Sequence, residues 1–319
     1  MKLARGNHFR WLAGILLAAA MVGACGGTTP DAGPGQGTVE PVALGADEKL
    51  RVVATTNILG DIVGQVGGDY IELTVLMDVG VDPHSYVPNP ADMAAVHDAH
   101  VVFASGAGLE VNLDEMFQTA GGDAVHIYAS DGLVLRQAAG GGEQAVDPHV
   151  WFDVQNTIRW VETIEGTLAA LDPADAGVYR ANAAAYIQQL EELDAWVMEQ
   201  VAAIPEANRR LVTNHPAFAY LERYGLKQVG AVYPVSPSAE PSAQDIAALE
   251  DVIRSYGVPA IFTESTVNPK LGQQVANDTG AKLVTLYTGS LGGPGSGAET
   301  YIQLIRYDVT AIVQALKGP

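Results

Sequence analysis

Cysteine and basic side chains are both scarce in this chain of 319 residues. The single cysteine, Cys25, leaves no partner for an internal disulfide and excludes a cysteine-rich zinc module. Lysine and arginine total 17 against 37 aspartates and glutamates, and the resulting formal charge of −20 repels phosphate backbones. We therefore expect no nucleic-acid partner, whereas an acidic surface attracts cations. The chain is 48% hydrophobic and 17% charged, which is enough apolar material for sizeable cores.

The N-terminal region has the layout of a secretory signal. Basic residues precede an apolar run over residues 11–22, which at about a dozen residues is too short to cross a bilayer. The run ends in Val22-Gly23-Ala24-Cys25, a tetrad that resembles the bacterial lipobox. The resemblance implies a signal peptide over residues 1–24 and lipid attachment to the sulfur of Cys25. An ordinary signal with an incidental cysteine is the alternative.

Residues 25–47 are rich in Gly, Pro, Thr, Asp and Gln and have few large apolar side chains. This composition predicts a flexible, solvated tether. A lipid anchor followed by such a tether would hold a folded module outside a membrane and close to it.

The rest of the chain alternates short β-rich runs with helical patterns. We expect strands at residues 50–54, 71–77, 101–104, 210–213, 260–262 and 282–286. Helices are expected at 58–66, from Pro90 with Asn89 as its cap, after His215, and at 244–256, 269–279 and 300–317. This alternation predicts two α/β sandwich lobes with mostly parallel sheets, over residues 48–171 and 205–319.

One long helical segment separates the two lobes. It begins at Asp172 and Pro173, a cap followed by proline at the first helical position, and ends at Pro205. Apolar residues recur within it in steps of 3 and 4, the spacing of one buried helix face. A helix over residues 172–204 would extend about 45 Å, at about 1.5 Å per residue. Such a rigid rod joins two lobes and limits bending between them.

Three histidines occupy similar settings along the chain. The sequence Val-Asp-Pro-His ends at His84 and again at His149, 65 residues later, and His215 follows 66 residues further on, next to Pro216. Proline fixes its own φ and keeps the preceding residue extended, so each histidine leaves a strand or loop end in a defined direction. Ligands bind at the carboxyl edge of α/β sheets, and imidazole is a good ligand for zinc and its neighbours. The pattern therefore predicts a metal site.

The other histidines lack this setting. His8 lies in the signal, His97 and His100 flank a helix end, and His126 lies in a strand-like stretch. A single histidine beside a proline is more often an ordinary loop residue than a ligand. The repetition of one four-residue sequence is what favours a metal role for the other three.

Several longer segments resemble the zinc/manganese substrate-binding lipoproteins of bacterial ABC transporters, the cluster A-I family. They are residues 80–86 (GVDPHSY), 147–153 (DPHVWFD), 215–221 (HPAFAYL), 224–226 (YGL), 240–243 (EPSA) and 264–270 (ESTVNPK). The resemblance covers about residue 50 to the C-terminus. It implies two α/β lobes joined by one long helix, no catalysis, and a single metal ion in the cleft, bound by His84, His149 and His215.

The family's fourth ligand is usually an aspartate in a late segment of the type LYSDSL. The matching residues here, 286–291, are LYTGSL, so Gly289 stands where the family has aspartate. Two candidates remain for the fourth position: water, or Glu264 from the neighbouring loop. We favour Glu264, because an anionic oxygen offsets part of the charge of the metal.

Three neutral imidazoles with at most one oxygen favour Zn²⁺ by donor softness and tetrahedral preference, with Mn²⁺ as the alternative. The loop at residues 137–146 contains no histidine, so we expect no metal storage there. The sequence therefore predicts a lipid-anchored monomer on the extracytoplasmic face of a cell membrane. It would capture a divalent metal ion and deliver it to a membrane ABC permease and its ATPase for import.

A zinc hydrolase is the alternative from a different class. Three histidines with an open position are also the layout in which zinc activates water, and Glu264 is the one general base that the sequence suggests. The chain has no His-Glu-x-x-His helix and no nucleophile elbow. The anchor, tether and long helix suit capture and delivery better than catalysis. An adhesin-like role or a degenerate site without metal is the remaining alternative.

Overall fold

The computed structural model describes residues 39–138, 146–233 and 240–318, which lie within one compact unit, Gln36–Pro319. The expected signal peptide, Cys25, residues 25–38 of the expected tether and most of the loop at 137–146 lie outside the described residues. Within the described ranges, no helix is both long and apolar enough to cross a membrane.

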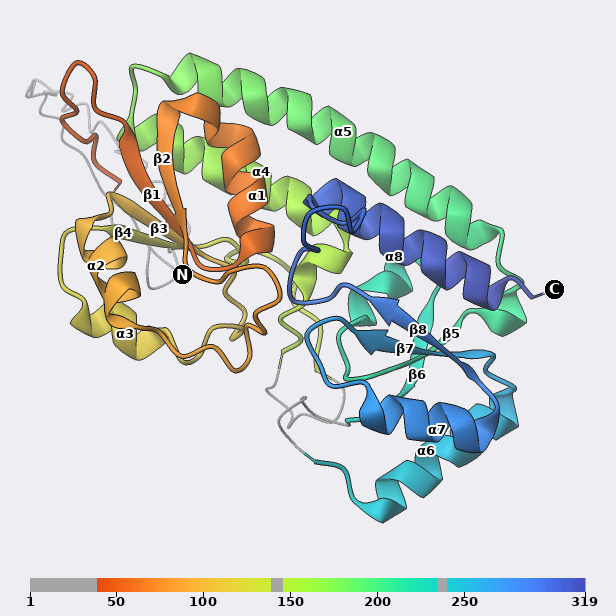
Figure 1. Cartoon of the computed structure of the whole chain (residues 1–319). Helices are drawn as coiled ribbons and strands as arrows, with labels where there is room; N and C mark the ends of the chain where they lie inside the picture. The colour runs from red at the N-terminus through yellow and green to blue at the C-terminus, as the bar shows by residue number, and fades with distance from the viewer. Residues whose placement is uncertain (1–38, 139–145, 234–239, 319) are drawn as a thin grey trace, which may run out of the picture. The chain divides into compact units, whose positions relative to one another are not determined.

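The N-terminal lobe is built on four parallel strands in the order β2-β1-β3-β4 (Figure 1). The strands are β1 (Leu50–Ala54), β2 (Ile71–Val75), β3 (Val101–Ala104) and β4 (Val125–Tyr128). The intervening helices are α1 (Asn57–Gly67), the 3-10 turn η1 (Gly68–Tyr70), α2 (Pro90–Asp98) and α3 (Asp114–Thr119). The predicted cap of α2 is confirmed, because the Asn89 side chain accepts from the backbone at Ala91 and Asp92.

The C-terminal lobe repeats this topology, with four parallel strands in the order β6-β5-β7-β8. Its strands are β5 (Arg210–Thr213), β6 (Lys227–Ala231), β7 (Ala260–Glu264) and β8 (Lys282–Leu286). Its helices are η3 (Glu206–Asn208), η4 (Ala219–Tyr224), α6 (Ala243–Tyr256), α7 (Lys270–Thr279) and α8 (Tyr301–Leu316). The prediction of an α/β fold with two largely parallel sheets is confirmed.

Two elements of the C-terminal lobe differ from expectation. The segment after His215 forms a 3-10 helix, η4, rather than an α-helix. Strand β6 has no clear signal in the sequence, because Lys227, Gln228 and Gly230 make up most of its five residues and favour strands weakly. Its pairing with the central strand β5 supplies what its own side chains lack.

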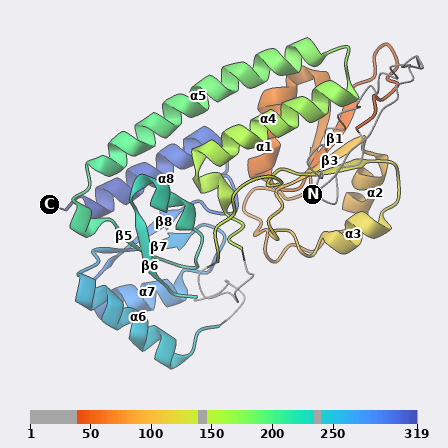
Figure 2. The same ribbon diagram turned by 180° about the vertical axis from the view of Figure 1, so that it is seen from behind.

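Two long helices follow, α4 (Val154–Leu171) and α5 (Ala176–Ala202), and α5 extends over both lobes, as Figures 1 and 2 show from opposite sides. Helix α5 packs on α4 and α1 of the N-terminal lobe and on α8 of the C-terminal lobe. It is the helix expected over residues 172–204, although Asp175 rather than Asp172 occupies the N-cap position. Its buried face carries the predicted apolar residues, from Tyr179 to Val201. Helix α4, which the sequence analysis missed, begins at an Asp153 cap.

One hydrophobic core runs through both lobes. It extends from Leu50 on β1 to Leu316 on α8, and smaller clusters cover the other face of each sheet. Because the lobes share buried side chains, a large movement of one against the other would expose core surface to water. Val42 and Leu44, from the described end of the expected tether, also pack against this core, and Val42 N donates to Leu171 O at 2.8 Å.

Candidate metal centre

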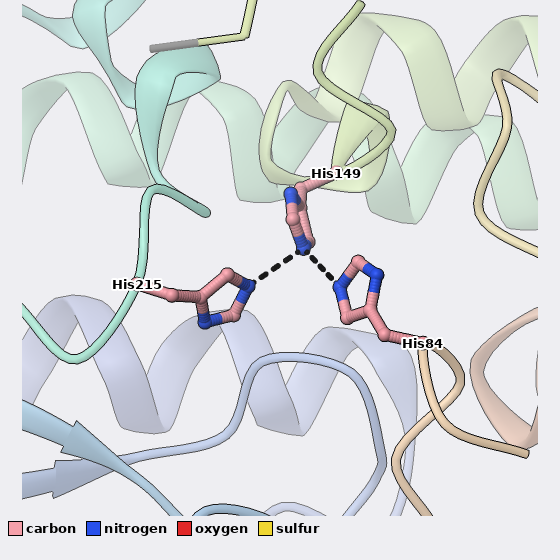
Figure 3. Close-up of side chains that lie close together, drawn as sticks. All are labelled: His84, His149 and His215. Atoms are coloured by element: carbon pink, nitrogen blue, oxygen red, sulfur yellow. Dashed lines mark hydrogen bonds between the residues drawn. The ribbon is translucent and has the colours of Figure 1, made fainter. Parts of the chain in front are cut away.

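The structure brings His84, His149 and His215 together at the junction of the two lobes (Figure 3). His84 comes from the loop after β2, His149 from the segment before α4, and His215 from just beyond β5. The Nε2 atom of His149 lies 3.1 Å from Nε2 of His84 and 3.1 Å from Nε2 of His215. Within the described ranges, these residues form the one group of three or more His, Cys, Asp or Glu side chains whose potential ligand atoms all lie within 4.8 Å of one another.

The two Asp-Pro-His sequences orient their histidines in different ways. Asp82 Oδ1 accepts from the backbone N of His84 at 3.0 Å, which forms a side-chain turn that presents the ring. Asp147 Oδ1 accepts instead from the ring itself, at 2.7 Å from His149 Nδ1, and from the His149 backbone N at 2.9 Å. A hydrogen on Nδ1 leaves Nε2 of His149 as the free nitrogen that faces the cluster.

His215 is held by Glu264. Its Nδ1 lies 2.5 Å from Glu264 Oε1, which also accepts from the His215 backbone N at 3.2 Å. The other oxygen of Glu264 accepts from Thr288 Oγ1 at 2.5 Å. Glu264 therefore lies behind His215 as its orienting partner. The oxygens of Glu264 do not belong to the group of potential ligand atoms, although the sequence favours Glu264 as the fourth ligand.

Burial and charge affect the histidines differently. Burial, together with the rings of His149 and His215, lowers the pKa of His84 to about 2. Burial also opposes protonation of His215, but the Glu264 carboxylate outweighs it, so the pKa of His215 is raised. Burial acts to raise the pKa of Glu264, yet the attraction of His215 prevails and that pKa is lowered. A metal ion that binds His215 must therefore displace a proton that Glu264 helps to hold there.

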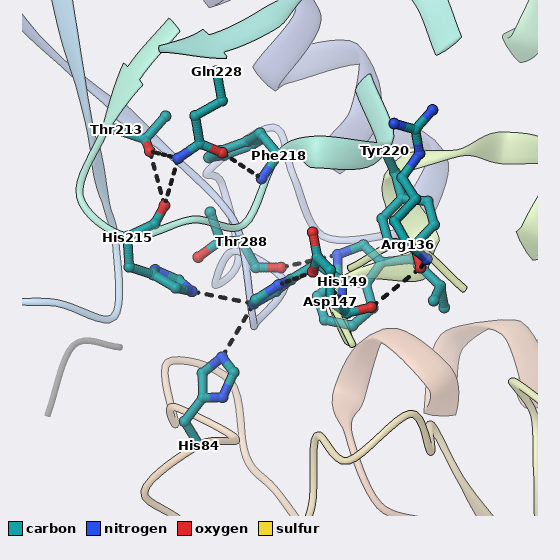
Figure 4. Close-up of polar contacts among 12 residues, drawn as sticks. His84, Arg136, Asp147, His149, Thr213, His215, Phe218, Tyr220, Gln228 and Thr288 are labelled. Carbon is teal, nitrogen blue, oxygen red and sulfur yellow. Dashed lines mark hydrogen bonds and ion pairs between the residues drawn. The ribbon is translucent and has the colours of Figure 1, made fainter. Parts of the chain in front are cut away.

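A second layer of hydrogen bonds fixes the backbone around the cluster (Figure 4). Tyr220 donates to the carbonyl oxygen of Asp147 at 3.1 Å. Thr213 Oγ1 and Gln228 Nε2 donate to the carbonyl oxygen of His215 at 2.8 and 3.2 Å. Sequence patterns did not identify these residues or the roles of Asp147 and Thr288. The one available signal was the position of Asp147, two residues before a predicted ligand.

The remaining described histidines lie elsewhere. His97 Nδ1 contacts the carbonyl oxygen of Ala120 at 3.1 Å, His100 Nδ1 accepts from Arg51 N at 3.0 Å, and the His126 ring packs on Phe117. None of the three belongs to the cluster formed by His84, His149 and His215.

Converging imidazoles at the junction of two parallel sheets define a protein that binds a transition-metal ion. The chain belongs to the family described as zinc-uptake complex component A, periplasmic, whose model matches residues 52–315. It is 37% identical to the manganese-binding lipoprotein MntA of Halalkalibacterium halodurans over 273 residues, covering 84% of this chain and 89% of the relative.

Solved structures show the same relationship. The periplasmic zinc-binding protein TroA of Treponema pallidum matches with a TM-score of 0.79 and 30% identity, covering 84% of this chain and 99% of TroA. A Mn-bound periplasmic metal-binding protein from candidatus Liberibacter asiaticus matches with a TM-score of 0.77 and 28% identity, over 84% and 100% of the two chains. The chain is thus a metal-binding substrate-binding protein of the metal ABC transporter class and not an enzyme, which removes the zinc hydrolase alternative.

Proposed function

We propose that this chain captures Zn²⁺ outside the cytoplasm and delivers it to an ABC permease for import. The observation that carries the proposal is the all-nitrogen donor set of His84, His149 and His215, whose ligand atoms lie within 4.8 Å of one another. Imidazole donors suit Zn²⁺, whereas Mn²⁺ is better served by carboxylate, carbonyl and water oxygens. Asp147 and Glu264 would orient two of the ligands and raise their basicity. Water, rather than Glu264, would occupy the fourth position.

Manganese is the second candidate. It is favoured by the name of the MntA relative, which is manganese-binding, and by the Mn-bound state of the Liberibacter structure. MntA, at 37% identity, is more similar to this chain in sequence than TroA is at 30%, whereas the Liberibacter structure, at 28% identity and a TM-score of 0.77, is slightly less similar than TroA at 30% and 0.79.

Competition titration of the purified mature protein with Zn²⁺ and Mn²⁺ against a chromophoric chelator, after elemental analysis, tests the proposal. We expect bound zinc on purification and an affinity for Zn²⁺ at least about 100-fold above that for Mn²⁺, or about 2.8 kcal/mol. Tighter binding of Mn²⁺ would favour the second candidate. Binding of neither ion would refute the function in both forms.

The proposal also includes the location and partners of the chain. A signal peptide over residues 1–24, a lipid on Cys25 and a tether would hold a monomer beside the permease and its ATPase. Support comes from the lipoprotein name of the MntA relative. The mature protein should partition into detergent with membrane lipids, and Cys25→Ser should abolish this. A Cys25→Ser chain that stays membrane-bound is anchored by some other segment.

A further inference from the structure

One short segment after β8, residues 288–291, contacts the surroundings of all three histidines. On the C-terminal side, Thr288 Oγ1 donates to Glu264, the partner of His215, at 2.5 Å. The carbonyl oxygen of Thr288 accepts from Trp151 Nε1 at 3.1 Å, two residues beyond His149. The segment is therefore bonded to the orienting partner of His215 and to the turn that follows His149.

The same segment is hydrogen-bonded to the loop that carries the third ring. Ser290 Oγ accepts from Gly80 N at 2.7 Å and from Asn57 Nδ2 at 3.1 Å. Asn57 Oδ1 in turn accepts from Leu291 N at 2.8 Å. Ser290 is fully buried and Asn57 is 8% exposed, so breaking these bonds would leave polar groups without water as a substitute. Gly80 and His84 belong to one loop, which is thus held against the segment.

Gly289 lies against the loop that carries His84. A Cβ atom built on Gly289 would lie 2.7 Å from Cδ and 3.0 Å from Cγ of Pro83, distances that real Cβ atoms do not tolerate without a shift. Apart from chain neighbours, the Pro83 ring is all that such an atom would meet within 4 Å among the described residues. The φ of Gly289 is outside the left-handed region, so its backbone alone would accept a side chain. The Pro83 ring is the single obstacle.

We propose that Gly289 is a specificity-determining residue of the metal site. Its missing side chain lets Pro83, and with it His84, close against residues 288–291. The site then closes on three imidazoles, and solvent rather than the chain completes the coordination. A side chain at position 289 would clash with Pro83 unless the loop that carries His84 moved away. This inference rests on the metal-binding function proposed above and adds the reason why no oxygen ligand comes from this segment.

The test compares Gly289→Ala with Gly293→Ala in the full mature chain. Gly293 lies in the same loop, and a Cβ there meets nothing within 4 Å. Zn²⁺ affinity is measured by competition titration, and the visible absorption of bound Co²⁺ reports the geometry of coordination. We expect Gly289→Ala to bind Zn²⁺ at least about tenfold more weakly, or about 1.4 kcal/mol, with a changed Co²⁺ spectrum. Gly293→Ala should match the wild type in both.

A double variant separates this contact from general damage. If the Pro83 ring is the obstacle, Pro83→Ala combined with Gly289→Ala should bind Zn²⁺ as well as Pro83→Ala alone, so the two substitutions should be strongly non-additive. Should Gly289→Ala fail to fold by circular dichroism, the double variant should regain the fold. A double variant as weak, or as unfolded, as Gly289→Ala overturns the inference. So does a Gly289→Ala chain with wild-type affinity and spectrum.

Specificity is tested by adding the missing oxygen donor. With Pro83→Ala making room, Gly289→Asp should shift the ratio of Mn²⁺ to Zn²⁺ affinity towards Mn²⁺ by about tenfold or more relative to Pro83→Ala, since Mn²⁺ prefers oxygen ligands. In the presence of Pro83, Gly289→Asp should weaken both ions. An unchanged ratio in the double variant contradicts the specificity role. A wild-type chain that binds neither Zn²⁺, Mn²⁺ nor Co²⁺ would instead refute the proposed function itself.

Discussion

The two lobes share a strand order, and in each a buried glutamate follows or ends the third strand, but the two glutamates have different partners. In the N-terminal lobe, Glu110 accepts from Thr55 Oγ1 at 2.6 Å, Ser105 N at 2.7 Å and Gly106 N at 3.0 Å. In the C-terminal lobe, Glu264 accepts from His215 and Thr288. Glu110 thus organises a loop, whereas Glu264 orients a potential metal ligand.

The partner decides the direction in which the pKa of each carboxyl group is shifted. Burial raises the pKa of Glu110, and its neutral donors offset this only in part. Burial acts on Glu264 in the same direction, but the imidazole of His215 reverses the result and the pKa is lowered. The same topology can therefore use a buried carboxyl group to organise a loop or to position an imidazole. The difference is whether a titratable partner lies beside the carboxyl group.

The comparison between the lobes assumes that both lobes supply ligands to the metal ion. His84→Ala, His149→Ala and His215→Ala should each weaken Zn²⁺ binding by about 100-fold or more, which is about 2.8 kcal/mol. The reason is that each removes one of three converging nitrogens. Competition titration measures the effect.

The matched controls are the histidines outside the cluster, His97→Ala, His100→Ala and His126→Ala. These should change the affinity by less than about threefold, well under 1.4 kcal/mol. Any of the first three variants that kept wild-type affinity would be removed from the ligand set.

The variants Glu264→Gln and Glu110→Gln test whether the two glutamates have different roles. Glu264→Gln removes the anion behind His215 and should weaken Zn²⁺ binding by about 10–100-fold. Glu110→Gln should leave binding unchanged. Its amide would face the N–H donors of Ser105 and Gly106, so the free energy of unfolding should fall by about 1–3 kcal/mol. Competition titration gives the Zn²⁺ affinities, and urea denaturation of the metal-free proteins gives the free energies of unfolding. Equal effects of the two variants on Zn²⁺ binding would contradict the contrast between the lobes.

The pH dependence of Zn²⁺ affinity tests the role of Glu264, because protons compete with the metal ion for His215. The raised pKa of His215 means that a metal ion must displace its proton, so Zn²⁺ affinity should fall steeply from about pH 7.5 to pH 5. Without the carboxylate the pKa of His215 should drop, and Glu264→Gln should show a shallower dependence over the upper part of this range. Affinities measured at five pH values in both proteins test this. Parallel profiles would show that Glu264 does not control the proton on His215.

The smallest effect concerns the metal-free protein. The pKa of His215 is raised from 6.5, so the stability that its protonated form contributes is present below about pH 6.5 and is lost as the pH rises through the folded-state value. The pKa of Glu264 is lowered from 4.5, so its contribution is present above about pH 4.5 and is lost as the pH falls through its folded-state value. Unfolding free energies in chelator should therefore decline above pH 6.5 in the wild type more than in Glu264→Gln. Identical declines would argue against this ion pair.

Local patterns predicted most of the fold. The runs at 50–54, 101–104 and 282–286 are strands in the structure, and the apolar spacing of α5 describes its buried face. Weak local signals account for two of the differences between prediction and structure. Strand β6 is polar and depends on its neighbour β5, and the segment after His215 adopts a tighter 3-10 turn.

The amino-acid sequence by itself determined the alternating strands and helices, the long helix and the three proline-flanked histidines, because hydrophobic periodicity and the geometry of proline act over a few residues. Only the tertiary structure decided that these histidines converge, that Glu264 lies behind His215 rather than among the ligand atoms, and that Pro83 fills the space beside Gly289. Contacts such as that between Asn57 and Ser290, 233 positions apart, depend on how two sheets and their shared core pack together. The direction of a side chain at such a junction is set by neighbours that no local pattern identifies.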